Sequence, residues 1–262
     1  MHLPVGVVGL ILCSVAIYAQ NPVAYATDAR LVALAGTGAA LKGVSATWLN
    51  PAAAVGDTDW AYGASAAQLS GVARLRVVTG QARYRNLALQ LAATRFERYH
   101  AFRFGLCYAR PITRALRIGA GFTLLRQDII GHSRQLGMVG VLGGQFDITG
   151  GLRFGAYAAI PSDRSLQELR AGGGLRYLVS ENVSLLLDGR YDRLWGWSLH
   201  TALRYAPSES LVLRLGYDGA GGAMSVGATY VLGVLGEADV AVRYHPLLGA
   251  GGAAGFLRRG GR

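Results

Sequence analysis

Residues 115–127 read ALRIGAGFTLLRQ, and their side chains alternate between two kinds. Every second position from Leu116 to Leu124 is apolar, while the four positions between them are arginine, glycine, glycine and threonine. Successive side chains of a β-strand point to opposite faces. This stretch therefore predicts a strand with one apolar face and one face of small and polar residues.

The same alternation recurs along the chain from Trp60 onwards. Fourteen segments show it; the first three and the last are the least regular, so twelve strands is the alternative count. Pro111, Pro161, Pro207 and Pro246 all fall at predicted strand ends, where a missing N–H group is tolerated. The predicted strands are residues 60–69, 72–84, 86–97, 100–110, 115–127, 134–147, 150–160, 168–179, 183–193, 195–206, 211–219, 222–232, 238–245 and 250–258.

Composition favours a membrane barrel over a soluble sandwich, which would also bury one face of each strand. Hydrophobic residues make up 52% of the chain and charged residues only 16%, against about 25% charged in a typical soluble domain. The segments are long enough for the roughly 9–11 residues that a tilted membrane strand needs. Aromatic residues, which are typical of membrane interfaces, lie near the ends of the apolar rows, as at Trp60, Phe102, Tyr108, Tyr177, Tyr191, Trp197, Tyr205, Tyr217, Tyr230 and Tyr244.

We therefore predict an all-β protein, a transmembrane antiparallel β-barrel of about fourteen strands with a short N-terminal plug segment. Such a barrel belongs in the outer membrane of a Gram-negative bacterium, in contact with its lipid. The first 19 residues resemble a signal peptide, with cleavage after Ala19 or, as the alternative, after Ala26. The predicted organisation is a signal peptide at 1–19, a plug at 20–58 and the barrel at 59–262.

The formal net charge is +11, and Lys42 is the only lysine among 26 basic residues. The arginines are spread singly over the predicted strands, which argues against a nucleic-acid partner because that requires a basic patch. Two interpretations of the inward charges stay open: a ladder of ion pairs that stiffens the barrel, or an interior that attracts anions. The predicted lumen charges are Arg117, Arg153, Arg176, Arg190, Arg204, Arg214, Arg243, Asp188, Asp218 and Asp239, with Arg74, Arg76, Arg103 and Asp192 on the same faces.

Residues 34–56, LAGTGAALKGVSATWLNPAAAVG, superficially resemble a phosphate-binding loop. Neither the Walker spacing nor the dinucleotide glycine pattern fits, so we predict no nucleotide cofactor. No histidine pair has metal-ligand spacing, and no serine lies in a nucleophile elbow. The closest approach to a catalytic pair is His132-Ser133, which has no visible acid or oxyanion partner. We therefore predict no metal, no cofactor and no enzymatic activity.

The stretch carries a different resemblance. Asp28-Ala29-Arg30, the small residues of 34–40 and the corner Trp48-Leu49-Asn50-Pro51-Ala52 are similar to the N-terminal signature of FadL-like outer-membrane barrels. Within that superfamily the segment most resembles the PorV and PorQ branch, which is associated with type IX secretion. The closing residues 244–249, YHPLLG, are similar to the end of short members.

The resemblance implies a plug folded into the periplasmic mouth of the barrel, with plug or gating residues Gly36, Gly38, Trp48, Asn50 and Pro51. Small residues allow close backbone packing, and Asn50 can bond its own backbone in an Asx-turn before Pro51. The implied function is a non-enzymatic docking or shuttle component for secretion-system or secreted proteins. The alternative is a FadL-like passive channel for hydrophobic or small anionic molecules.

Overall fold

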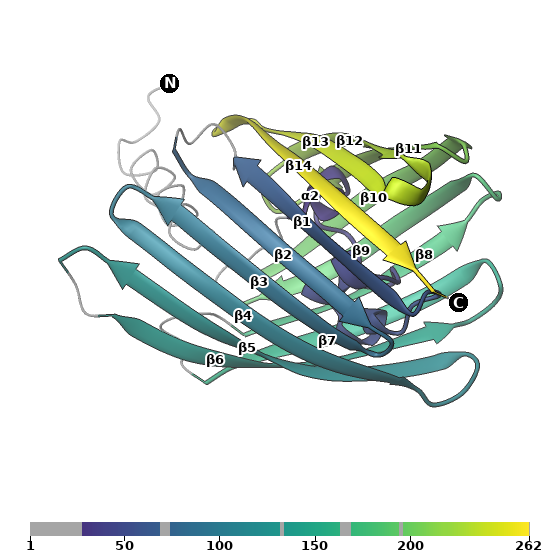
Figure 1. The fold of residues 1–262 in the computed structure, drawn as a ribbon, viewed down its shortest axis with the longest axis horizontal. Helices are drawn as coiled ribbons and strands as arrows, with labels where there is room; N and C mark the ends of the chain where they lie inside the picture. Colours follow the sequence, from purple (N-terminus) through teal and green to yellow (C-terminus); the bar gives the residue numbers. More distant parts are fainter. Residues whose placement is uncertain (1–27, 69–73, 132–133, 163–168, 194–195, 262) are drawn as a thin grey trace, which may run out of the picture.

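The computed structural model describes residues 28–68, 74–131, 134–162, 169–193 and 196–261 (Figure 1). The predicted signal peptide at 1–19, both candidate cleavage sites and the His132-Ser133 pair lie outside the described residues.

Fourteen antiparallel strands close into a barrel, as the alternation predicts (Figure 1). Each strand pairs with its neighbours in sequence, and β1 closes the ring by pairing with β14 from Trp60–Gly260 to Gln68–Gly252. Closure leaves no unpaired sheet edge, which a strand protein inside lipid requires. The strands are β1 Trp60–Gln68, β2 Arg76–Tyr84, β3 Leu87–Phe96, β4 Tyr99–Pro111, β5 Leu116–Ile129, β6 Gln135–Asp147, β7 Leu152–Pro161, β8 Arg170–Leu178, β9 Val183–Asp192, β10 Gly196–Ser208, β11 Leu211–Asp218, β12 Ala223–Val231, β13 Glu237–His245 and β14 Gly249–Gly260.

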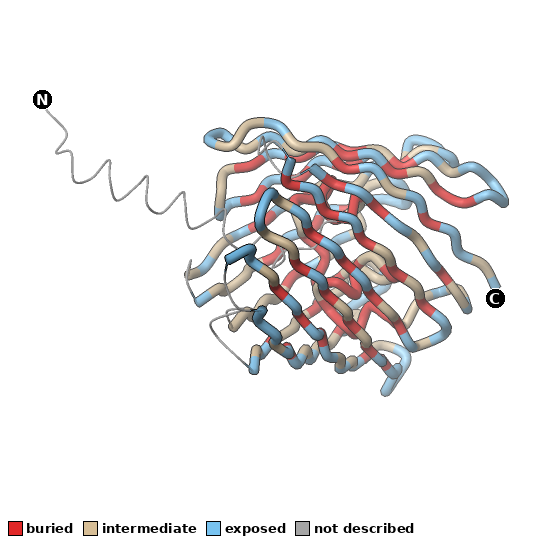
Figure 2. The backbone as a smooth tube through the Cα atoms, turned by 60° about the vertical axis from the view of Figure 1, so that its left-hand side comes forward, coloured by how far each residue is buried: buried red, intermediate tan, exposed pale blue. Residues whose placement is uncertain are grey.

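The two faces of each strand differ as predicted. In β5, Ile118 and Leu124 are 48% and 47% exposed on the outer surface, whereas Arg117 and Thr123 are only 5% and 3% exposed on the inside. Figure 2 shows the same alternation of buried and exposed positions along most strands. The outer surface is thus a belt of apolar side chains, and outward aromatic rings such as Tyr108, Trp197 and Tyr244 are among them.

The two ends of the barrel are unequal. One end, here called the turn end, holds the start of β1, the end of β14 and tight connections such as residues 209–210 between β10 and β11. The opposite end is called the loop end. Bacterial barrels carry their short turns on the periplasmic side, which orients the turn end towards the periplasm. Pro111 and Pro161 end β4 and β7, and Pro246 follows β13 directly.

Residues 28–59 lie inside the barrel, as a plug. They contain the short helix α2 (Ala29–Ala33) and two 3-10 turns, η2 (Val44–Trp48) and η3 (Pro51–Ala54). Helix α2 packs against β11–β14 and β1, whereas η3 packs against β4, β5 and β6. The plug therefore spans the lumen from wall to wall (Figure 1). A third 3-10 turn, η4 (Gly233–Leu235), connects β12 and β13. No helix among the described residues is both long and apolar enough to cross a membrane.

Candidate functional site: the plug and its contacts with the lumen

An ion-pair cluster anchors α2 to the wall. Arg30 binds Glu237 at 2.5 Å and Asp239 at 2.8 Å, and both carboxylates are almost completely buried. Asp28 caps the helix by accepting a hydrogen bond from the Arg30 backbone N–H at 3.0 Å. Its other carboxylate oxygen accepts one from Gln81 Nε2 at 2.7 Å. Because these partners lie on β2 and β13, the cluster holds α2 against two separate parts of the wall.

Burial and charge act on the two ionisable plug residues of this cluster in different ways. Burial raises the pKa of the Asp28 carboxyl above its usual range, although the nearby Arg30 acts against this shift. Burial by itself would lower the pKa of Arg30, but attraction to Asp239 and Glu237 outweighs it and the pKa is raised. Arg30 therefore stays charged at every accessible pH, and it compensates the two wall carboxylates permanently.

Asp188, predicted as a lumen charge, contacts the plug directly. One of its oxygens accepts hydrogen bonds from the backbone N–H groups of Gly38 at 2.8 Å and Ala39 at 3.1 Å. The side chain is 1% exposed, and Arg190 lies 3.6 Å away. Arg190 also donates a hydrogen bond to the carbonyl of Gly36. Gly36 and Gly38, both predicted plug residues, are thus held by one acid and one arginine of β9.

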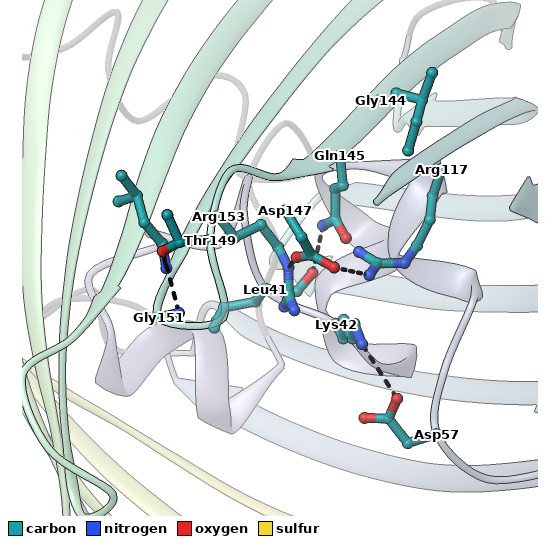
Figure 3. A network of polar contacts seen from close by, with 12 residues as sticks. Leu41, Lys42, Asp57, Arg117, Gly144, Gln145, Asp147, Thr149, Gly151 and Arg153 are labelled. Carbon is teal, nitrogen blue, oxygen red and sulfur yellow. Dashed lines mark hydrogen bonds and ion pairs between the residues drawn. The ribbon is translucent and has the colours of Figure 1, made fainter. Parts of the chain in front are cut away.

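The Asn50-Pro51 corner is fully enclosed. Asn50 Oδ1 accepts a hydrogen bond from the Ala52 N–H at 3.0 Å, which is the predicted Asx-turn. Asn50 Nδ2 donates to the carbonyls of Ala39 at 2.8 Å and Gly144 at 3.0 Å, so the side chain joins the plug to β6. Gln145 supports the same region through hydrogen bonds to Leu41 and Ala39 carbonyls at 2.6 and 3.1 Å (Figure 3).

Glycine on the wall makes this approach possible. A Cβ atom on Gly143 would overlap Asn50 Oδ1 and lie 2.9 Å from Pro51 Cδ. Its neighbour across the pair, Gly119, would bring a Cβ to 2.6 Å from the Ala52 N atom. The corner therefore fits only against a wall without side chains at these two positions.

A Gly143→Ala variant is expected to lose about 1–3 kcal/mol of stability, the usual cost of overpacking. The matched control is Gly144→Ala in the same strand, where the nearest atom would be 3.7 Å from the new Cβ. That control should stay within about 0.5 kcal/mol of the wild type. Urea unfolding in lipid vesicles measures both changes, and equal losses for the two variants would contradict the packing argument.

Trp48, a predicted plug residue, lies in a partly polar setting. Its ring packs with Leu31 and Ala92, but its Nε1 donates to Gln81 Oε1 at 2.8 Å. The Arg103 guanidinium lies over the ring, 5.2 Å from the centroid. The indole therefore contributes a hydrogen bond and a cation–π contact in addition to its apolar area.

Some of the predicted inward charges form a ladder within the wall. Asp147 bridges Arg117 and Arg153 (Figure 3), and Asp218 binds Arg243. Arg176 and Arg204 point inward but form no ion pair with any described residue. The ladder is thus incomplete.

Two of the predicted lumen residues are placed differently. Arg76 is exposed on the outer face of β2, whose inward row is Val77, Thr79, Gln81 and Arg83, and Arg74 is an exposed turn residue with φ of 75°. The inward prediction for both was wrong because an arginine at a strand end can reach the aqueous boundary from the outer face.

A Ser-His-Asp group lies at the loop end, and the sequence analysis did not find it. Ser198 Oγ is 2.9 Å from His200 Nε2, and His200 Nδ1 is 3.2 Å from Asp218 Oδ1. The histidine–aspartate contact lacks hydrogen-bond geometry, however, and Asp218 also binds Arg243 and the Ala220 N–H. We assign the group to the polar network of the wall. The i, i+2 spacing of Ser198 and His200 on one strand was the available sequence signal.

The inner wall at the loop end carries apolar side chains on one side, placed among the polar side chains of Arg103, Thr123 and Gln127. Ala101, Leu125, Val139 and Ala159 of β4–β7 all point inward and are 3–5% exposed. Tyr99 packs against the first two. A path along this side of the lumen would offer apolar contacts before it reaches the plug.

No protein-family model matches the sequence, and no curated protein sequence matches it either. Several solved structures, however, have a similar fold. The Ralstonia pickettii toluene transporter TbuX superposes with a TM-score of 0.68 at 13% identity, covering 87% of this chain and 96% of that one. The CymD monoaromatic hydrocarbon channel superposes with a TM-score of 0.69 at 12% identity, and the match covers 88% of this chain and 97% of that one. A Pseudomonas aeruginosa FadL homologue superposes with a TM-score of 0.60 at 11% identity, and the match covers 88% of this chain and 97% of that one.

The fold is similar to that of these three proteins, one of which is a FadL homologue. At these identities the likeness concerns the fold alone, and it agrees with the apolar outer belt in placing the protein in an outer membrane. The resemblance to PorV and PorQ has no counterpart among these three structures, which are a toluene transporter, a monoaromatic hydrocarbon channel and a FadL homologue.

Proposed function

We propose that the protein is a passive outer-membrane channel for small hydrophobic molecules, closed by residues 28–59 in the state described. The observation that carries this is a lumen filled by a separate N-terminal segment. That segment binds the wall through hydrogen bonds and ion pairs, which water can replace, and through small apolar clusters. The inward apolar side chains of β4–β7 at the loop end offer contacts for an apolar molecule on its way to the plug. The fold shared with a toluene transporter and a monoaromatic hydrocarbon channel supports the same function.

The proposal includes the domain organisation and the roles of the plug residues. Residues 1–19 act as a signal peptide, 20–58 as the plug and 59–262 as the barrel. Gly36 and Gly38 give the plug its close contact with β9, Trp48 fixes it to β2, and Asn50-Pro51 is the pivot on which it turns. A docking role in protein secretion has less support, because the solved structures of similar fold include a toluene transporter and a monoaromatic hydrocarbon channel.

Uptake of an apolar fluorescent probe by intact Gram-negative cells tests the channel. Cells that produce the protein are expected to take up the probe faster than cells with an empty vector. The Asn50→Ala, Pro51→Ala double variant removes the corner and leaves the carbonyls of Ala39 and Gly144 without this donor. It should change the uptake rate severalfold if the corner is a pivot; unchanged uptake at equal protein level would favour docking.

A further inference from the structure

A cavity of about 300 Å³ lies at the turn end of the lumen. One side is made by the plug, with Leu31, Leu34 and residues 41–46. The other side is the inner wall of β1, β2 and β10–β14. The volume is at the lower end of the roughly 300–1,000 Å³ that is usual for small-molecule sites.

The cavity carries an excess of positive charge. Its described lining includes three acidic residues, Asp57, Glu209 and Glu237, and six cationic ones. The cationic residues are Arg30, Lys42, Arg83, Arg204, Arg214 and Arg259.

Three of these cations have carboxylate partners. Arg30 binds Glu237 and Asp239, Arg259 binds Glu237 at 2.7 Å, and Lys42 binds Asp57 at 3.2 Å. The acidic residues nearest to the cavity are thereby largely compensated, and the remaining cations compete for little negative charge.

The other three cations are not compensated to the same degree. Arg83 is 4% exposed, and its guanidinium donates to the carbonyls of Arg85 and Thr58 at 2.8 and 2.7 Å rather than to a carboxylate. Arg204 forms no ion pair with a described residue, and the closest carboxylate of Arg214 is Asp239 at 3.9 Å. Neutral carbonyls satisfy hydrogen bonds but do not cancel the charge of a buried guanidinium.

Arg204 and Arg214 also face each other. They are directly opposite in the register of β10 and β11, and both point into the lumen. Like charges in directly opposite positions of a sheet are destabilising. An anion placed between them would turn this repulsion into attraction.

The remaining lining is mostly apolar, with the hydroxyl side chains of Ser45, Thr58 and Thr229 among it. Leu34 packs with Leu186 and Ala202 on one side of the cavity, and Val44 packs with Ala61 and Leu257 on another. A ligand that fits both surfaces has an anionic group and a compact apolar body. Guanidinium groups bind the planar carboxylate well because both can form two parallel hydrogen bonds.

We propose that this cavity binds a small carboxylate with a compact apolar body, such as an aromatic acid, through the charge of Arg83, Arg204 and Arg214. Half of the site belongs to the plug, so the ligand binds only when the plug is docked. By linkage, an occupied site stabilises the docked plug and lowers the open fraction of the channel. The effect on permeability rests on the proposed channel function, whereas the site itself does not.

Thermal unfolding of the purified full-length protein in detergent, with benzoate as the probe, tests the site. Wild-type protein is expected to gain about 5 °C or more at a benzoate concentration a hundred times its Kd. Arg204→Gln should abolish this gain. It should also leave the benzoate-free protein about as stable as the wild type, because Arg204 forms no ion pair with a described residue and its repulsion of Arg214 disappears.

The matched control is Arg126→Gln, on an outward arginine paired with Asp128 far from the cavity, which should keep the full benzoate gain. The same measurement with two other compounds at equal ionic strength tests each part of the ligand separately. Benzyl alcohol has the aromatic body without the charge, and phosphate has the charge without the aromatic body. An equal gain with benzyl alcohol would overturn the role of charge, and an equal gain with phosphate would overturn the role of the apolar body. No benzoate gain in the wild type, or the same gain in Arg204→Gln, would refute the site.

The proposed binding site and the proposed channel function can be refuted independently of each other. A protein that binds benzoate but does not speed uptake of the apolar probe would refute the channel and leave the site in place. Uptake of the probe without benzoate binding would do the reverse.

Discussion

An Arg30→Ala variant should release the α2 end of the plug and show the largest loss of plug stability of any single substitution considered. The change leaves the buried Asp239 with only Arg214, 3.9 Å away, as a cationic partner among the described residues, whereas Glu237 keeps Arg259 at 2.7 Å. Removing one partner of a buried ion pair costs about 3–5 kcal/mol. We therefore expect hydrogen exchange of the α2 amides to accelerate by at least about a hundredfold, since about 1.4 kcal/mol corresponds to a factor of ten.

The comparison for this prediction is Arg126→Ala. It removes one partner of an exposed pair with Asp128 on the outer face of β5, where about 0.2–1 kcal/mol is expected. Exchange in α2 should not change in that variant. If Arg30→Ala left α2 as well protected as in the wild type, the ion-pair cluster could not be its anchor.

The strands were predictable because the two faces of each strand lie in different environments, which require different side chains. A residue on the outer face meets hydrocarbon and a residue on the inner face meets the plug or water, so the period of two survives in nearly every strand. β9 was expected at 183–193 and is found at Val183–Asp192, and β11 was expected at 211–219 and is found at Leu211–Asp218. The rule weakens at strand ends, as Arg76 shows, because there both faces reach water.

The plug contacts could be predicted only in part. The Asx-turn of Asn50 involves residues two positions apart, so the short sequence Asn-Pro-Ala indicates it. One of the two interpretations of the lumen charges would pair Asp188 with arginines, yet its main partners are two backbone N–H groups 149 and 150 residues away in the chain. Backbone donors look alike at every position, so no side-chain pattern points to them. The same is true of Gln145, which binds the carbonyls of Ala39 and Leu41.

Two sets of inward polar side chains on the wall differ in what they bind, and the difference bears on how the proposed channel would open. Asp147, Arg117 and Arg153 bind one another and hold strands together, whereas Asp188 and Gln145 bind the plug. A substitution in the first set should weaken the barrel without moving the plug. A substitution in the second set should move the plug while leaving the fourteen-stranded wall in place.

The Asp188→Ala variant tests whether the side chains that bind the plug control its position, because Asp188 accepts two hydrogen bonds from the plug backbone. The substitution leaves the N–H groups of Gly38 and Ala39 without their acceptor in a buried position. An unsatisfied buried polar group costs about 1–3 kcal/mol. We expect the open fraction in planar-bilayer recordings to rise about tenfold or more. Asp188→Asn, which keeps an acceptor oxygen but loses the charge, should give an intermediate rise.

The matched control for Asp188→Ala is Asp147→Ala. It removes a carboxylate of the same size that binds only wall arginines among the described residues. It should lower the unfolding temperature of the barrel but leave the open fraction near that of the wild type. If both variants raised the open fraction equally, the plug would respond to general loosening of the wall, and the direct hold of Asp188 on Gly38 and Ala39 would not be what keeps the channel closed.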